Sequence, residues 1–291
     1  MRIAVTGARG QVATALQSLK GIDVVAYARP DLDLAIPSTV APILRAGSPD
    51  VIVNAAAYTA VDRAEQEASE AFAINEAGAR AVAEAAAGLG VPLIHLSTDY
   101  VFDGAKPAPY VETDAPNPQS VYGASKYAGE RAVMQAHARA VIVRASWVYA
   151  PHGNNFVRTM LRLAGERDAV RVVADQRGMP MAAPDIAEAL ARVARNLVDA
   201  PERGNLHGLF HLGGEGDTTW ADFAEATFAG SAARGGPSAR VERITTAEFG
   251  APAPRPPNSR LDGAKLEAAH GVRLPHWRTS LDRVLDTILR G

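Results

Sequence analysis

The sequence predicts an α/β protein built on a doubly wound parallel sheet, with a smaller second lobe in its C-terminal half. Short apolar runs rich in Val and Ile alternate with Ala-rich helical segments through the first half of the chain. These runs are apolar throughout, which is typical of parallel strands that helices cover on both faces. In such sheets, ligands bind at the carboxyl ends of the strands.

Five strands and four helices are expected in the first half. The expected strands cover residues 2–7, 23–28, 49–57, 91–98 and 140–146. The helices expected between them cover residues 11–20, 38–47, 62–88 and 125–137. Pro42 falls within the second of these helices, where proline is tolerated only near the first turn, so this helix is expected to be weak.

The regular alternation ends after Ser146. We expect amphipathic helices at 154–166 and 185–199, a strand at 209–214, and a helix at 218–230 with Thr218 or Thr219 as N-cap. Gly- and Pro-rich segments at 230–240 and 251–259 are typical of loops. The chain therefore divides into a first domain of residues 1–148, to which elements return at about 183–222, and a lobe formed mainly by residues 149–291.

Composition excludes several classes of protein. The 291 residues include no cysteine, so disulfides, cysteine-based zinc sites and thiol chemistry are excluded. The formal net charge is −2, and no Lys/Arg cluster suggests nucleic acid or a membrane surface as a partner. No apolar run approaches the roughly 18 residues of a membrane span, and the N-terminal run is too short for a signal peptide. We expect a cytoplasmic protein with a small-molecule ligand, no nucleic-acid partner and no membrane contact.

A turn with two glycines, TGARGQVA at 6–13, joins the first strand directly to the first helix. Gly7 and Gly10 allow the backbone to turn tightly and to approach a pyrophosphate, which would lie at the helix N-terminus. Ala13 takes the third position of the motif, where a small residue lets helix and strand pack. The same residues could form a simple turn, but their place at the first strand–helix junction favours a dinucleotide-binding, Rossmann-type domain.

The end of the second strand bears on the choice of cofactor. Ala28 stands where folds that prefer NAD usually carry an acid for the ribose hydroxyls, and Arg29 follows it. An arginine here can hold the additional phosphate of NADP; the alternative interpretation is a solvated surface arginine. Asp33 and Leu34 come next and could flank the adenine.

Polar side chains also follow the third and fourth strands. Asn54 precedes three alanines that would let a cofactor lie against the backbone, although Asn54 could be only a turn residue. Ser97, Thr98 and Asp99 end the fourth strand and project at the carboxyl edge of the sheet. Side chains of these types act there either as turn formers or as donors to a substrate.

Tyr122 and Lys126 lie four residues apart in SVYGASKYAGE, residues 120–130, so they share one face of a helix. A tyrosine alone is a poor acid at neutral pH because its pKa is about 10. A lysine ammonium nearby favours the phenolate and lowers that pKa. We interpret the pair as a proton donor and the cation that tunes it, against the alternative of an ordinary helix surface. Tyr127 faces another side of the helix and is not a candidate.

Together these motifs resemble the extended short-chain dehydrogenase/reductases, and within them the reductases of 4-keto sugar nucleotides. The resemblance runs nearly end to end and rests on the segments GARGQV, PDVIVNAAAYTAVDRAE, STDYVFDG, VYGASKYAGE, SWVYAPHGNNF, TMLRLA, DQRG, TTWADFA and RPPNSRL. Several of these segments are loops, whose sequence packing alone would not dictate. The resemblance implies NADPH or NADH as hydride donor and a dTDP-linked 4-keto-6-deoxy sugar as acceptor.

The resemblance also implies roles for individual residues. Tyr122 would protonate the forming alkoxide, Lys126 would support Tyr122, and Thr98 would hydrogen-bond the ketone oxygen. The implied substrate contacts are Asp99 and Trp147 to the sugar, and Asn155 and Arg255 to the nucleotide diphosphate. The residues implied to line the cofactor, which join Gly7, Arg29 and the catalytic pair, are Gly10, Gln11, Val12, Asp33, Leu34, Ala57, Tyr58, Thr59 and Leu96.

Two residues depart from the family pattern. Ala15 stands where some members carry a glutamate of a magnesium-linked dimer, so we expect no metal site and a monomer or weak homodimer. Met181 stands where members usually carry a threonine on the substrate side.

Three other functions stay open on the sequence. Sugar-nucleotide dehydratases share the fold and the Tyr–Lys pair, but they need an acid–base pair after the threonine, and here Asp99 is followed by Tyr100. Epimerases keep NAD tightly bound, which Arg29 disfavours weakly. A regulatory subunit that binds NADP without turnover belongs to a different class. The complete set Thr98, Tyr122, Lys126 and Trp147 favours an active reductase.

Overall fold

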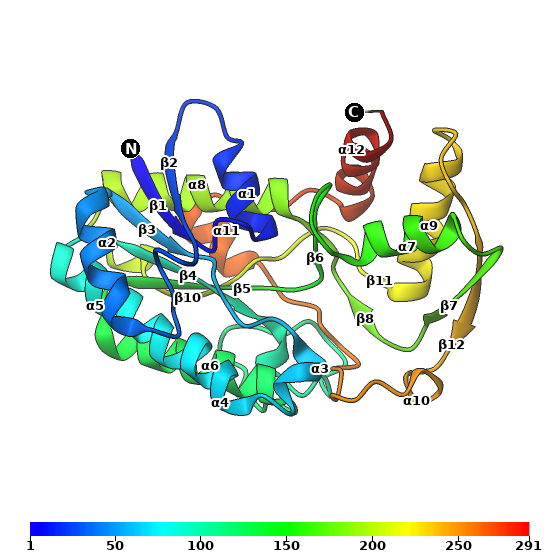
Figure 1. Ribbon diagram of the computed structural model, residues 1–291, viewed down its shortest axis with the longest axis horizontal. Coiled ribbons are helices and arrows are strands. Elements are labelled where there is room, and N and C mark those ends of the chain that lie inside the picture. The colour runs from blue at the N-terminus through cyan, green and yellow to red at the C-terminus, as the bar shows by residue number, and fades with distance from the viewer. Residues whose placement is uncertain (291) are drawn as a thin grey trace.

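The computed structural model describes residues 1–290 and contains a six-stranded parallel sheet in the order β10-β5-β4-β3-β1-β2 (Figure 1). Its strands are β1 (Arg2–Thr6), β2 (Asp23–Tyr27), β3 (Val51–Asn54), β4 (Leu93–Thr98), β5 (Ala140–Ala145) and β10 (Gly208–His211). The register pairs Thr6 with Asn54 and Thr98 with Ala145, so these strands end at one common edge. The predicted fold class is confirmed, and the strand expected at 209–214 supplies the sixth position.

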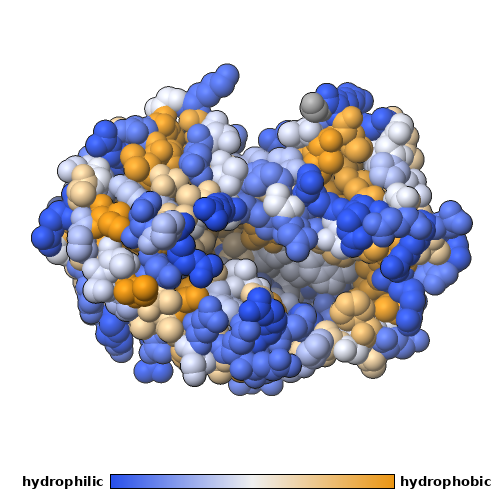
Figure 2. Space-filling view, viewed as in Figure 1, coloured by the Kyte–Doolittle hydropathy of each residue, from blue (hydrophilic) through white to orange (hydrophobic). Residues whose placement is uncertain are grey.

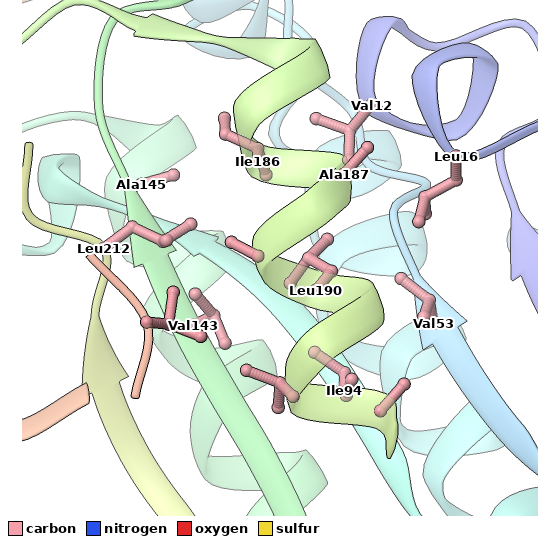
Figure 3. Close-up of a cluster of buried hydrophobic side chains, with 14 of the residues drawn as sticks. Val12, Leu16, Val53, Ile94, Val143, Ala145, Ile186, Ala187, Leu190 and Leu212 are labelled. Atoms are coloured by element: carbon pink, nitrogen blue, oxygen red, sulfur yellow. The ribbon is translucent and has the colours of Figure 1, made fainter. Parts of the chain in front are cut away.

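Helices cover both faces of this sheet. One face carries α1 (Gln11–Gln17), α8 (Ala183–Asp199) and α11 (Ala264–His270); the other carries α2 (Val40–Gly47), α5 (Ala79–Leu89) and α6 (Val121–Ala136). Successive strand residues point to opposite faces, so Ile94 and Val143 pack on Leu190 of α8, whereas Leu93 and Ile142 belong to the core under α5. Figure 3 shows the first of these two cores, with α8 lying across the strands.

The Ala/Glu segment expected as one helix at 62–88 is not a single helix. It forms α3 (Val61–Ala64), α4 (Ala68–Phe72), a π-helical stretch η2 (Ala73–Gly78), and then α5. Asn75 in the π-helical stretch holds both backbone groups of Tyr58, accepting from N–H at 2.8 Å and donating to the carbonyl at 3.1 Å. These hydrogen bonds attach the π-helical stretch to the loop at Tyr58, whereas the helix itself is interrupted earlier, at residues 65–67.

The second lobe is built from four helices and a parallel strand pair, at the right of Figure 1. Its elements are α7 (Phe156–Ala164), α9 (Trp220–Ala232), α10 (Thr246–Phe249), α12 (Trp277–Arg290), β7 (Ala169–Val173) and β12 (Arg240–Ile244). Thr219 is the N-cap of α9, because its hydroxyl accepts from the N–H of Asp222 at 3.1 Å. Of the two threonines predicted as the N-cap, Thr218 and Thr219, it is therefore Thr219 that caps the helix.

Short elements join the two lobes. They are the strand pairs β6 (Val148–Tyr149) with β9 (Met181–Ala182) and β8 (Arg177–Gly178) with β11 (Thr218–Thr219). The 3-10 turns η1 (Pro37–Thr39), η3 (Asp99–Val101) and η4 (Gly204–Leu206) lie within the first lobe. Pro42 lies in the first turn of α2, as expected. Among residues 1–290, no helix is both long and apolar enough to cross a membrane. Figure 2 shows a hollow between the two lobes, and that hollow contains the candidate site.

Candidate active site

A cleft of about 740 Å³ lies along the carboxyl edge of the sheet and reaches the second lobe. Fifteen of the residues proposed from the sequence line this cleft, and it joins the glycine turn at β1 to the Tyr–Lys helix α6. They are Gly7, Gly10, Gln11, Val12, Arg29, Asp33, Leu34, Ala57, Thr59, Leu96, Thr98, Asp99, Tyr122, Lys126 and Trp147. The fold therefore brings together side chains that are up to 140 positions apart in the chain, from Gly7 to Trp147.

The turn between β1 and α1 is shaped by its glycines. Gly7 has a φ of 79°, and a Cβ on it would lie 2.9 Å from the Cα of Ala56 on the neighbouring strand end. Gly10 precedes α1 with no side chain capping the first turn, so backbone N–H groups there are free to meet a ligand. A backbone cradle that a Cβ would fill, at a strand–helix junction, fits the pyrophosphate of a dinucleotide.

Two arginines line the cleft near the ends of β1 and β2. Arg29, after β2, and Arg9, in the glycine turn, both line the cleft and are exposed. Neither forms an ion pair with any carboxylate in the part of the chain that the structure describes. Asp33 accepts a hydrogen bond from the N–H of Ala35, which shapes the loop after β2. Arg9 was not proposed from the sequence, although it stands inside the quoted glycine motif.

Thr98 and Asp99 stand at the end of β4. The Thr98 hydroxyl donates to Asp99 Oδ1 at 3.1 Å and accepts from the N–H of Tyr100 at 3.2 Å. Asp99 is 3% exposed, and its Oδ2 has no hydrogen-bond partner among residues 1–290. Burial raises the pKa of Asp99 to about 6. An unpartnered buried oxygen at the cleft wall is suited to accept from a polar ligand group.

Tyr122 and Lys126 share one face of α6, as their spacing predicted. Ser120 begins this helix as its N-cap and accepts from the N–H of Gly123 at 3.1 Å. Burial raises the pKa of Tyr122 to about 12, while the Thr98 hydroxyl acts in the opposite direction. Desolvation of the phenolate therefore outweighs any lowering by Lys126, contrary to the expectation from the pair alone. The phenol is held in its protonated form.

The ammonium group of Lys126 is held in place by a hydrogen bond and by burial. Its Nζ donates to the backbone carbonyl oxygen of Leu96 at 2.7 Å, and the side chain is 3% exposed. Burial lowers the pKa of Lys126 to about 8, and the negative charge of Glu130, one turn further along α6, raises it in part. Glu130 was not proposed from the sequence, although it follows Lys126 at the spacing of one helical turn.

Three residues proposed from the sequence do not line the cleft. Tyr58 is turned away, and its hydroxyl donates to Glu67. Asn155 is the N-cap of α7 and donates to the carbonyls of Ala150 and His152, so its amide is used within the loop. The third is Arg255.

Arg255 instead forms an ion pair with Asp62 at 2.8 Å. The pair joins the start of α3 to the loop at 251–259 and lies close enough to Tyr100 to affect its pKa. Residues that line the cleft and were not proposed include Arg9, Tyr100, Gly153, Asn154 and Ile186. Of these, all but Ile186 lie within quoted motifs, whereas Ile186 is a helix residue with no distinguishing sequence signal.

The two departures from the family pattern lie outside the cleft lining. Met181 is 1% exposed, belongs to the hydrophobic core under α8, and pairs with Val148 through β9 and β6. Ala15 is buried in the same core. Within residues 1–290, no group of three or more His, Cys, Asp or Glu side chains is placed to hold a metal ion.

The parallel sheet, the glycine turn and the Tyr–Lys helix at one cleft define a dinucleotide-dependent oxidoreductase of the short-chain dehydrogenase/reductase type. A family model described as RmlD substrate binding domain matches residues 1–290, and the chain therefore belongs to this family.

Relatives of known name agree with this assignment. A dTDP-4-dehydrorhamnose reductase of Sinorhizobium fredii is 51% identical over 291 residues, which cover 99% of this chain and 98% of that protein. The protein of the same name from Escherichia coli K12 is 43% identical over 258 residues, which cover 88% and 85% of the two chains. The crystal structure of the Bacillus anthracis dTDP-4-dehydrorhamnose reductase in complex with NADP superposes with a TM-score of 0.89 at 37% identity, over 97% and 98% of the chains.

Proposed function

We propose that this chain reduces the 4-keto group of dTDP-4-dehydro-L-rhamnose to give dTDP-L-rhamnose, with NADPH or NADH as hydride donor. One observation carries the proposal: a single cleft joins a glycine turn shaped for a pyrophosphate to Thr98, Tyr122 and Lys126. The names of its relatives and the NADP complex of one of them support the choice of substrate and cofactor. The reaction would complete dTDP-rhamnose synthesis and supply a precursor of cell-surface polysaccharide such as lipopolysaccharide O-antigen.

Two side chains would act directly on the ketone oxygen. The bound reduced nicotinamide would supply a hydride to carbon 4, which leaves negative charge on the ketone oxygen. Thr98 would donate a hydrogen bond to that oxygen, and Tyr122 would transfer its phenolic proton to it, which completes the alcohol. Donors that meet charge only as it develops stabilise the transition state more than the ground state.

The environment of Tyr122 suits this role. Because burial raises its pKa to about 12, the phenol keeps its proton at neutral pH until a stronger base forms beside it. After the transfer, the ammonium of Lys126 would stabilise the phenolate, and the Leu96 carbonyl holds that ammonium in place.

The remaining contacts are assigned to the sugar nucleotide. Asp99 and Trp147 would meet the sugar, since both line the cleft. Arg255 would reach a diphosphate only by leaving Asp62, and Asn155 only by giving up its helix cap. Asn154, which lines the cleft, is the better placed of the two asparagines.

The test is turnover with the enzymatically prepared 4-keto sugar nucleotide, followed by the loss of reduced-nicotinamide absorbance. We expect oxidation of one NADPH for each dTDP-L-rhamnose formed. A Tyr122→Phe variant should bind NADPH normally and lose at least about a hundredfold in turnover. NADPH binding without substrate-dependent oxidation would favour a regulatory subunit, and sugar conversion without net oxidation would favour an epimerase; either result contradicts the proposal.

We also infer a monomer or weak homodimer that does not depend on a metal. Ala15, in place of an acid, removes a ligand from any magnesium-linked contact, and no carboxylate cluster replaces it among residues 1–290. Sedimentation of the protein with magnesium and with a chelator should give the same mass. A dimer that a chelator dissociates would contradict this inference.

A further inference from the structure

Trp147 is held in a backbone conformation that bulky residues rarely adopt. Its φ is 47°, and Ser48 is the only other non-glycine residue of positive φ in the described chain. Such a conformation costs of the order of 1–3 kcal/mol and persists only where surrounding contacts impose it. Here the Trp147 carbonyl accepts from the N–H of Met181 at 3.2 Å, and the next residue enters the β6–β9 pair. The strain occurs at a side chain that lines the cleft.

A second tryptophan fixes the Trp147 ring. The rings of Trp147 and Trp220 are stacked, with centroids 3.6 Å apart and planes 11° from parallel. Trp220 does not line the cleft, so one face of Trp147 is covered by a residue of α9 in the second lobe. Trp220 is itself held, because its Nε1 donates to Gln176 Oε1 at 3.1 Å and the Phe156 ring lies 4.5 Å away.

Gly178 provides the room for this stack. A Cβ at position 178 would overlap the Trp147 indole, with two of its ring atoms at 2.6 Å. Gly178 has no positive φ, so the close approach of the indole, and not backbone geometry, is what this position requires. Backbone strain, a stacked partner and a missing side chain thus converge on one orientation of one ring.

We propose that Trp220 and Gly178 are positioning residues that hold the Trp147 indole in one orientation at the wall of the cleft, where it would contact the 6-deoxy sugar of the substrate. Trp147 follows β5 and stacks on α9 of the second lobe, whereas Thr98 and Tyr122 belong to β4 and α6. The ring would therefore set the position of the sugar between the two lobes. This inference rests on the proposed function, because it takes the sugar nucleotide as the ligand of the cleft.

The stack can be detected without any ligand. Two stacked indoles whose transition dipoles are rotated relative to each other couple their electronic transitions and give a paired positive and negative band in the far-ultraviolet circular dichroism spectrum. We expect this couplet in the wild-type protein, its loss in Trp220→Leu, its reduction in Gly178→Ala, and its retention in Trp277→Phe. A crystal structure of the wild-type protein in which the two indoles are apart would overturn the inference, since the stack would not exist.

Steady-state kinetics then test whether the stack affects binding of the sugar. In Trp220→Leu and Gly178→Ala, KM for the 4-keto sugar should rise about tenfold, which corresponds to about 1.4 kcal/mol of lost binding. The affinity for NADPH, measured by titration, should stay unchanged, as should kcat, because a contact made equally in the ground and transition states affects KM alone. Gly88→Ala is the matched control, since a Cβ at Gly88 meets nothing within 4 Å. An unchanged KM in a variant that has lost the couplet would overturn the inference.

A double-variant cycle shows whether Trp220 acts through Trp147. In the Trp147→Ala background, adding Trp220→Leu should raise KM no further, because residues that act as a unit are not additive. Equal effects of Trp220→Leu in both backgrounds would overturn the positioning role. A wild type that binds NADPH but does not turn over would refute the proposed function instead, so the two failures are distinguishable.

Discussion

Glu130 of α6, one helical turn beyond Lys126, forms a bidentate ion pair with Arg144 of β5. Arg144 Nε donates to Glu130 Oε1 at 2.8 Å, and Nη2 donates to Oε2 at 2.6 Å. The Ser97 hydroxyl also donates to Oε1 at 2.5 Å, and the side chains of the pair are 5% and 1% exposed. The pair therefore ties the helix that carries Tyr122 to two strands of the sheet.

Removing one partner of this pair should destabilise the fold. Arg144→Met would leave the Glu130 carboxylate buried and without its counter-ion, which typically costs about 3–5 kcal/mol. The double variant Glu130→Gln/Arg144→Met should recover part of this loss, because no charge stays buried. Urea unfolding measures both. Arg162→Met, which removes one side of the exposed Arg162–Glu166 pair, is the control and should cost less than about 1 kcal/mol. A similar loss in both single variants would contradict the prediction.

The same carboxylate should influence the pH dependence of turnover. Lys126 has Tyr122 one turn before it and Glu130 one turn after it on α6. It also faces His95 on β4, whose pKa is lowered by burial and, to a smaller extent, by the charge of Lys126. Burial lowers the pKa of Lys126 to about 8, so its ammonium is lost as pH rises through that value. We expect kcat/KM to fall above about pH 8, and Tyr122 to stay protonated there because its pKa is about 12.

The Glu130→Gln variant tests the direction in which Glu130 shifts the alkaline decline of kcat/KM. The carboxylate raises the pKa of Lys126, so its removal should lower that pKa further and move the alkaline decline of kcat/KM to lower pH. The measurement is the full pH profile of both proteins, with circular dichroism as a check that the variant is folded. An alkaline limb that does not move, or one that moves upward, would show that Glu130 does not act on Lys126.

Sequence patterns predicted the features that local chemistry determines. The strands, the cap at Thr219 and the shared face of Tyr122 and Lys126 follow from periodicity and spacing along one segment. The break at residues 65–67 in the helix expected at 62–88 did not, nor did the π-helical stretch, where Asn75 makes hydrogen bonds to Tyr58, 17 residues away. Contacts between distant segments leave no such signal.

The pairing of Arg255 shows this limit most clearly. Its partner Asp62 lies 193 positions away in the sequence, and both side chains are suited to several roles when considered alone. Ion pairs such as this one, and Glu130–Arg144, arise only when helices and strands from different segments pack together. Packing, not residue type, decides whether such a side chain meets a ligand or a partner within the protein.

The glycine turn yields a prediction with a closely matched control. Gly7→Ala should weaken NADPH binding at least about tenfold, because the new Cβ must push away the backbone at Ala56 and narrow the cleft. Gly21 has nearly the same φ, 76° against 79°, but a Cβ there meets nothing within 4 Å. Gly21→Ala should thus share the backbone strain and keep NADPH affinity. If titration shows equal affinities for the two variants, the close approach at Gly7 is not what shapes the site.

Arg29 offers a test of cofactor choice. The side chain lines the cleft after β2 and has no carboxylate partner among residues 1–290, and no acid stands at the preceding Ala28 to hold ribose hydroxyls. A guanidinium binds a phosphate through charge-assisted hydrogen bonds, which NADPH would allow and NADH would not. Arg29→Ala should therefore lower the ratio of kcat/KM for NADPH to that for NADH about tenfold, since a charge-assisted hydrogen bond contributes about 1.5–3 kcal/mol.

A second arginine and the dependence on salt bear on how a change in this NADPH/NADH ratio is interpreted. Arg9 also lines the cleft, so a further fall of the ratio in Arg9→Ala/Arg29→Ala would show that both arginines hold the phosphate. Arg45→Ala, at an exposed position of α2 outside the cleft lining, is the control for a general loss of positive charge. Exposed charges are screened by salt, so the preference for NADPH in the wild type should itself decrease as ionic strength rises. A ratio that is the same in wild type and Arg29→Ala would leave Arg29 as a solvated surface residue.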